Sequence, residues 1–170
     1  QAKTLFPYTT LFRSLDGFTD RAVFADDCGY VYKVVPGVDL AGGWNVNTGL
    51  GAIAVDPAGP GVPQYALFST LSTAGALGAA SPIAGTLAAR TDATSRLLLF
   101  FGTGGVESHP ITAANEFYAV YADTGQIRSK MAGSCNASMC EKFYGGAVVT
   151  TQQVIFTRTT DPAVGTTSCD

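Results

Sequence analysis

The chain has little charge, a single histidine and a single tryptophan. Only 14% of its 170 residues are Asp, Glu, Lys or Arg, and the formal net charge is −3. Without a cluster of Lys and Arg, the sequence offers no basic surface for a nucleic acid backbone. No run of about 18 apolar residues is present, so we expect no helix that spans a membrane. Neither nucleic acid nor a membrane span is therefore expected.

Hydrophobic residues and glycine are abundant instead. Hydrophobic residues make up 46% of the chain, which also has 20 glycines and 8 prolines. This hydrophobic content argues against disorder. Low charge combined with many turn residues favours an all-β fold, and 170 residues are enough for one domain with a core.

The clearest strand pattern lies in the middle of the chain. Residues 97–101 are a continuous apolar run that ends at Gly102, which predicts a strand buried on both faces. Residues 117–121 predict a second strand, and Asp-Thr-Gly at 123–125 predicts a tight reversal. Residues 126–131 return as a more polar strand. This succession is typical of a four-stranded propeller blade.

Similar strand pairs recur on both sides of this region. The other predicted strands cover residues 21–26, 30–35, 65–70, 81–90, 142–150 and 153–157, with a short one at 51–55 in a long connection. The pair formed by 81–90 and 97–101 and the pair formed by 142–150 and 153–157 are approximate copies, which indicates a repeat architecture. We expect a partial β-propeller of about three incomplete blades of antiparallel strands, whereas closure takes about four to eight.

No motif predicts catalysis. Gly-Thr-Gly-Gly at 102–105 lacks the Lys-Ser/Thr of a phosphate-binding loop, and no helical pattern follows it. We interpret it as the exit of a strand. His109 lacks a neighbouring nucleophile and an orienting carboxylate. The sequence therefore predicts a protein that is not an enzyme.

Four cysteines stand at positions 28, 135, 140 and 169. No Cys-x-x-Cys pair exists and His109 is remote, which argues against zinc. A disulfide between Cys135 and Cys140 across a short polar loop is favoured, with two thiols as the alternative, and it implies an oxidising compartment. The sequence leaves the pairing of Cys28 and Cys169 open.

A half calcium loop is a candidate metal site. Asp16, Gly17 and Asp20 fit the fifth, sixth and ninth positions of a loop whose carboxylates converge on one cation. The first half of such a loop is missing. An Asp-Gly turn that enters a strand is the alternative.

The first segment is unusual. Residues 4–14 resemble the translation of a common sequencing adapter, so we interpret residues 1–14 as an artefact and residues 15–170 as a propeller domain truncated at both ends. The alternative is a genuine edge strand with a proline kink.

Two stretches carry a resemblance to a known family. Phe-Gly-Thr-Gly at 101–104, followed by Glu-Phe-Tyr-Ala-Val-Tyr-Ala-Asp-Thr-Gly at 116–125, resembles the C-terminal β-propeller of the type IV pilus PilC/PilY family. The run Asp-Gly-Phe-Thr-Asp-Arg that begins at Asp16 is similar to its strand pair. The family more often has Gly-Asp where this chain has Asp26 and Asp27.

The resemblance implies a surface protein at the pilus tip, exported through the periplasm. Such a protein promotes pilus assembly and attachment, with minor pilins and a host or surface receptor as partners. It also implies calcium as the cofactor, with Asp16 and Asp20 as remnants of the loop.

The alternative is a propeller of a pyrroloquinoline-quinone dehydrogenase. Blades of that kind also carry Thr-Gly, followed by a packing tryptophan. This chain has Thr124-Gly125, but its single tryptophan is Trp44. The pilus module is therefore the favoured interpretation.

Overall fold

The computed structural model describes residues 9–13, 19–36, 44–46, 66–70, 81–83, 85–104, 115–136 and 139–162. Within these ranges the chain forms eleven strands and no α-helix, and all strand pairs are antiparallel. The all-β prediction is confirmed. The described part also contains no helix that could cross a membrane.

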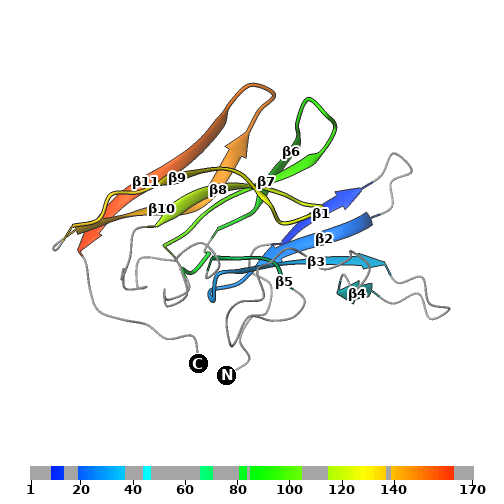
Figure 1. Ribbon diagram of the computed structural model, residues 1–170, viewed down its shortest axis with the longest axis horizontal. Coiled ribbons are helices and arrows are strands. Elements are labelled where there is room, and N and C mark those ends of the chain that lie inside the picture. The colour runs from blue at the N-terminus through cyan, green and yellow to red at the C-terminus, as the bar shows by residue number, and fades with distance from the viewer. Residues whose placement is uncertain are drawn as a thin grey trace.

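The strands form three sheets (Figure 1). The N-terminal sheet contains β1 (Thr9–Arg13), β2 (Thr19–Ala25), β3 (Tyr30–Pro36), β4 (Trp44–Val46) and β5 (Ala66–Ser69). The middle sheet contains β6 (Ala88–Thr91), β7 (Leu97–Gly102), β8 (Glu116–Tyr121) and β9 (Ile127–Ala132). The C-terminal hairpin consists of β10 (Met139–Val149) and β11 (Val154–Pro162).

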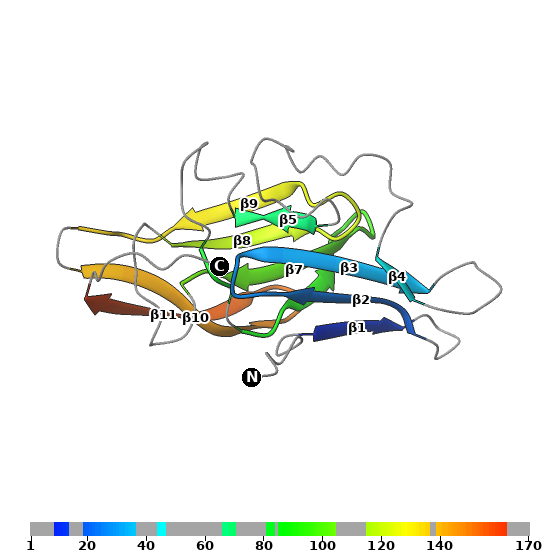
Figure 2. The same cartoon turned by 90° about the horizontal axis from the view of Figure 1, so that it is seen from below.

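Each sheet follows the chain closely. The middle sheet is a meander in which β6, β7, β8 and β9 pair in sequence order. In the N-terminal sheet, β2 pairs with one edge of β3, while β4 and β5 pair with different parts of β3. Figure 2 shows β1, β2 and β3 side by side, with β4 near one end of β3. The described strands form three sheets that stack on one another and do not close into a ring.

The middle sheet lies between the other two because β7 is apolar on both faces. Leu99 and Phe101 pack into one core cluster with the N-terminal sheet, for example with Leu67 and Phe68. Leu98 and Phe100 point the other way and belong to a second cluster with the C-terminal hairpin. Successive residues of a strand point to opposite faces, so a continuous apolar run needs a cover on each side. The prediction that residues 97–101 are buried on both faces is confirmed.

Glycine allows the layers to approach closely at two places. A Cβ atom on Gly102 would clash with the side chain and carbonyl of Phe143 on β10. Gly125 has φ +71° and would clash with the carbonyl of Leu67 on β5 if it carried a Cβ. Its amide donates to the carbonyl of Tyr121 at 2.8 Å and closes the β8–β9 turn. The predicted reversal at 123–125 is therefore confirmed.

The predicted strand at 81–90 is wrong in its first part, because the strand there is β6, which begins only at Ala88. Residues 81–83 bond to other layers instead. Gly104 donates its amide to the carbonyl of Pro82 at 2.9 Å, and Ile83 donates to Asp26 at 3.3 Å. The strand predicted at 51–55 lies outside the described residues, and β4 falls within the stretch predicted as a long connection.

The segment that resembles an adapter contains a strand. β1 pairs with β2 from Thr9 opposite Phe24 to Arg13 opposite Thr19. This is the edge-strand arrangement that the alternative interpretation describes. The proposed origin of residues 1–14 stays a prediction.

Candidate functional site

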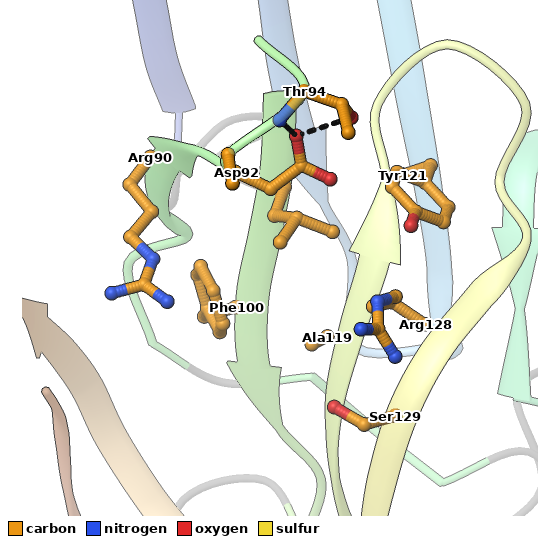
Figure 3. A pocket seen from close by; sticks show the side chains of 10 residues that line it. Arg90, Asp92, Thr94, Phe100, Ala119, Tyr121, Arg128 and Ser129 are labelled. Atoms are coloured by element: carbon orange, nitrogen blue, oxygen red, sulfur yellow. Dashed lines mark hydrogen bonds between the residues drawn. The ribbon is translucent and has the colours of Figure 1, made fainter. Parts of the chain in front are cut away.

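A hollow of about 430 Å³ opens on the middle sheet (Figure 3). Its floor consists of Leu98 and Phe100 on β7 and Ala119 on β8, which are buried side chains of the face that packs on the C-terminal hairpin. This volume is within the usual range for small-molecule sites.

Strand register brings the lining residues together. Arg90 on β6 is paired with Leu98, which is paired in turn with Tyr121 on β8. One row further, Phe100 is paired with Ala119, and Ala119 with Ser129 on β9. In a sheet, paired residues on the same face are neighbours. Four consecutive strands therefore contribute to one surface.

Two arginines stand on opposite sides of this floor. Figure 3 shows Arg90 beside Phe100 and Arg128, from β9, near Tyr121 and Ser129. Arg128 is exposed and makes no hydrogen bond or ion pair with the described residues. It can therefore reorient toward a bound group.

Arg90 is held by the turn of the C-terminal hairpin. Its Nη1 donates to the carbonyl of Thr150 at 3.0 Å and to that of Thr151 at 3.3 Å, and its Cζ lies 5.8 Å from the ring centroid of Phe100. Its Nε is buried and has no hydrogen-bond partner within the described part of the chain. An unmet buried donor costs about 1–3 kcal/mol.

The β6–β7 turn contributes a carboxylate to the rim. Oδ1 of Asp92 accepts from the amide of Thr94 at 2.8 Å, from the Thr94 hydroxyl at 2.7 Å and from the amide of Arg96 at 3.0 Å. The Thr94 hydroxyl is the main cause that lowers the pKa of Asp92 from its usual value. Asp92 is therefore ionised at neutral pH.

Tyr121 is fixed from its outer side. The Arg96 guanidinium lies 3.6 Å from the Tyr121 ring centroid, and it donates to both carboxylate oxygens of Asp123, at 2.8 and 3.1 Å. This bidentate bond lowers the pKa of Asp123. Because Asp123 balances the charge of Arg96, the charge facing the hollow comes from Arg90, Arg128 and Asp92.

The predicted calcium site is not tested by this geometry. Asp16 lies outside the described residues, and Asp20 belongs to β2 with its side chain outside the description. Among the described residues, no group of three or more His, Cys, Asp or Glu side chains converges. Calcium at Asp16 and Asp20 stays a prediction.

The structure shows a disulfide between Cys135 and Cys140, as the sequence predicts. The two residues also form an antiparallel bridge in the connection from β9 to β10. Glu141 donates its amide to the Ser134 carbonyl at 2.8 Å beside this bridge. The disulfide thus closes the short loop through which the chain enters β10. Cys28 lies in the β2–β3 turn, and Cys169 lies outside the described residues.

The glycine-rich stretch at the end of β7 leads the chain out of the strand, and its backbone hydrogen-bonds to neighbouring segments. The amide of Thr103 donates to Glu116 at 2.9 Å, and that of Gly104 to Pro82 at 2.9 Å. The Thr103 carbonyl accepts from the amide of Phe143 at 3.0 Å. A phosphate-binding loop needs such amides turned toward its ligand, whereas these two are used within the protein.

Arg90, Arg128 and Tyr121 were not predicted as site residues. They come from three strands. The register aligns Arg90 with Tyr121 through Leu98, and Arg128 stands at the register shift of β9, between Ile127 and Ser129. The predicted hairpins contain the signal in part, because consecutive pairing of the strands would have aligned Arg90 with Tyr121. No family model, curated protein or solved structure matches this chain.

Proposed function

We propose that this chain is a non-enzymatic β-propeller segment of a surface protein that acts in type IV pilus assembly and attachment. The observation that carries the proposal is the stacking of three antiparallel sheets in chain order. Propeller blades are four-stranded antiparallel sheets, and β6–β9 have that form. The middle sheet packs on a neighbour through each face, as an inner blade would.

The proposal extends to the setting that the pilus resemblance implies. The protein is exported through the periplasm, resides at the pilus tip, and contacts minor pilins and a host or surface receptor. A disulfide between Cys135 and Cys140 suits an oxidising compartment. Calcium, held in part by Asp16 and Asp20, is the proposed cofactor.

Cosedimentation with purified type IV pili tests the partner. We expect the chain to sediment with pili in a saturable manner and to stay in solution with the same shear fraction from cells that lack pili. Equal recovery in both fractions would overturn the pilus assignment.

A second experiment tests the enzyme alternative. The chain is incubated with pyrroloquinoline quinone and calcium, and dye-linked alcohol oxidation is measured. We expect no turnover above that of the quinone and calcium alone. Alcohol oxidation that depends on the protein would replace the non-enzymatic proposal with the quinoprotein one.

Calcium is tested by thermal unfolding of the chain with and without the ion. A ligand that binds only the folded state raises its melting temperature. We expect calcium to raise it, and the double variant Asp16→Asn with Asp20→Asn to lose this response. An unchanged melting temperature in the parent would remove calcium from the proposal.

A further inference from the structure

We propose that the hollow on the middle sheet binds a monoanionic ligand with a flat apolar body, that is, an aromatic carboxylate. The inference goes beyond the pilus role and does not depend on it. It rests on the floor of the hollow, on the charges around it and on the donors that its two arginines offer.

The floor selects a flat apolar body. Leu98, Phe100 and Ala119 are buried apolar residues at the base of the hollow, and the Tyr121 ring stands beside them under the guanidinium of Arg96. Aromatic groups prefer offset or edge contacts with such rings and gain energy from burial. A fully polar ligand would leave this floor without a complementary group.

The charges select a single negative charge. Two guanidinium groups, of Arg90 and Arg128, and one carboxylate, of Asp92, line the hollow, so its local charge is 2 − 1 = +1. The whole chain carries −3, so this positive surface is local. A monoanion balances it, whereas a phosphate dianion would exceed it and meet Asp92. The fixed hydrogen bonds of Asp92 keep that carboxylate ionised.

The donors select a carboxylate. A guanidinium offers a planar fork that matches two carboxylate oxygens. Arg128 is exposed and has no partner among the described residues. Its guanidinium N–H groups can therefore donate to a ligand carboxylate. Arg90 uses Nη1 for the hairpin turn and retains an unpaired Nε. Since Nε is buried, a small rotation of this side chain is needed before a ligand oxygen can reach it.

Benzoate and benzamide are the matched probes, because they differ in charge and share the ring. Titration of the isotope-labelled chain is followed by NMR at the amides of Ala119 and Ser129. We expect saturable shifts with millimolar benzoate and none with benzamide. No saturable shift with benzoate, or equal shifts with both probes, would overturn the proposal.

Arg128→Gln tests the arginine, and Arg158→Gln is the matched control. Both remove one exposed positive charge, and Arg158 lies on β11, where it pairs with Glu141 at 3.4 Å. We expect Arg128→Gln to weaken benzoate binding about tenfold, with a smaller loss in Arg128→Lys. The control should bind as the parent does. An equal loss in Arg158→Gln would reduce the effect to overall charge and contradict the site. Unchanged melting temperatures verify that the variants are folded.

Two sources could supply an aromatic carboxylate, and a second probe pair separates them. N-acetylphenylalanine represents the C-terminus of a peptide, and its amide is the neutral control. Tighter binding of N-acetylphenylalanine than of benzoate indicates a peptide end, and the reverse indicates a small aromatic acid. Binding of the amide as tight as that of the acid would overturn the role of the carboxylate. Failure in these titrations leaves pilus cosedimentation unaffected, so the two proposals fail separately.

Discussion

The middle sheet and the C-terminal hairpin differ in how many of their faces are covered. Strand β7 packs both faces into core clusters, whereas β10 and β11 pack one face through residues such as Phe143 and Phe156. Their other face carries Val148 and Ile155, which are 62% and 56% exposed. The β6–β7 pair and the β10–β11 pair are antiparallel and have approximately repeated sequences. Their different burial therefore comes from their neighbours in the stack.

The comparison indicates where stability resides. Apolar surface stabilises the fold in proportion to the area removed from water. An apolar side chain in the middle sheet should therefore contribute much more than one on the outer face of the hairpin.

The largest effect is expected for Phe101→Ala. Phe101 is 2% exposed and its ring lies 5.5 Å from the centroids of both Phe68 and Tyr118. Truncation should lower the free energy of unfolding by about 3–5 kcal/mol. Ile155→Ala on the hairpin should change it by less than about 0.5 kcal/mol. Urea unfolding measures both, and similar losses at the two sites would contradict the proposed difference between the sheets.

The next effect concerns the disulfide in the connection between these two regions. The disulfide spans a sequence separation of 5, and a loop of that size is worth about 2 kcal/mol in the chain-entropy description. Cys135→Ser combined with Cys140→Ala should lose about that amount under oxidising conditions. Under reducing conditions the loss should shrink, because the parent then lacks the bond as well.

Non-reducing peptide mapping is the direct control for this link. We expect a cross-linked peptide that contains Cys135 and Cys140 and separates on reduction. Two alkylated thiols in the parent protein would show that the pair is not bonded.

A smaller effect is expected at the β2–β3 turn, where a carboxylate is half-buried. Desolvation raises the pKa of Asp26 above 3.8, although the Tyr30 amide donates to it at 2.8 Å. Its protonated form is thus favoured by folding, so this stabilisation is present below pH 3.8 and is lost as the pH rises through the folded pKa. The stability of Asp26→Asn relative to the parent should therefore be greater at pH 7 than at pH 4. Urea unfolding of both proteins at the two pH values measures this difference. A smaller relative stability of the variant at pH 7 would contradict the raised pKa of Asp26.

The smallest effect is expected at the β8–β9 turn, where the pKa shift has the opposite sign. Asp123 bonds to Arg96, and its pKa is lowered below 3.8. Its contribution is present above pH 3.8 and is lost as the pH falls through the folded pKa. Because both partners are well exposed, Asp123→Asn should cost no more than about 0.5 kcal/mol at pH 7. A cost that persists at pH 2 would contradict this cause.

Local patterns predicted most of the middle sheet. The apolar run at 97–101, the second strand at 117–121 and the Asp-Thr-Gly turn each depend on residues within a few positions. The strand at 81–90 was predicted too long, because the carbonyl of Pro82 and the amide of Ile83 bond to distant parts of the chain. Such bonds have no signature in the local sequence.

The residues that line the hollow also have no signature in the local sequence. Arg90 and Arg128 belong to the first and last strands of the meander, and nothing in either local sequence marks them as a pair. The pairing of β6 to β9, with its shift at Arg128, brings them to one hollow. The hairpin turn then holds Arg90 in place through Thr150 and Thr151.

The fold class, the position of β7 and the reversal at Gly125 follow from the sequence alone, because composition, strand alternation and the backbone freedom of glycine act locally. The cluster that each face of β7 joins, the cover of the hairpin and the meeting of two distant arginines at one hollow follow from the stacking of the sheets. Burial and strand pairing depend on segments far apart in the chain. Their partners are set when the sheets stack.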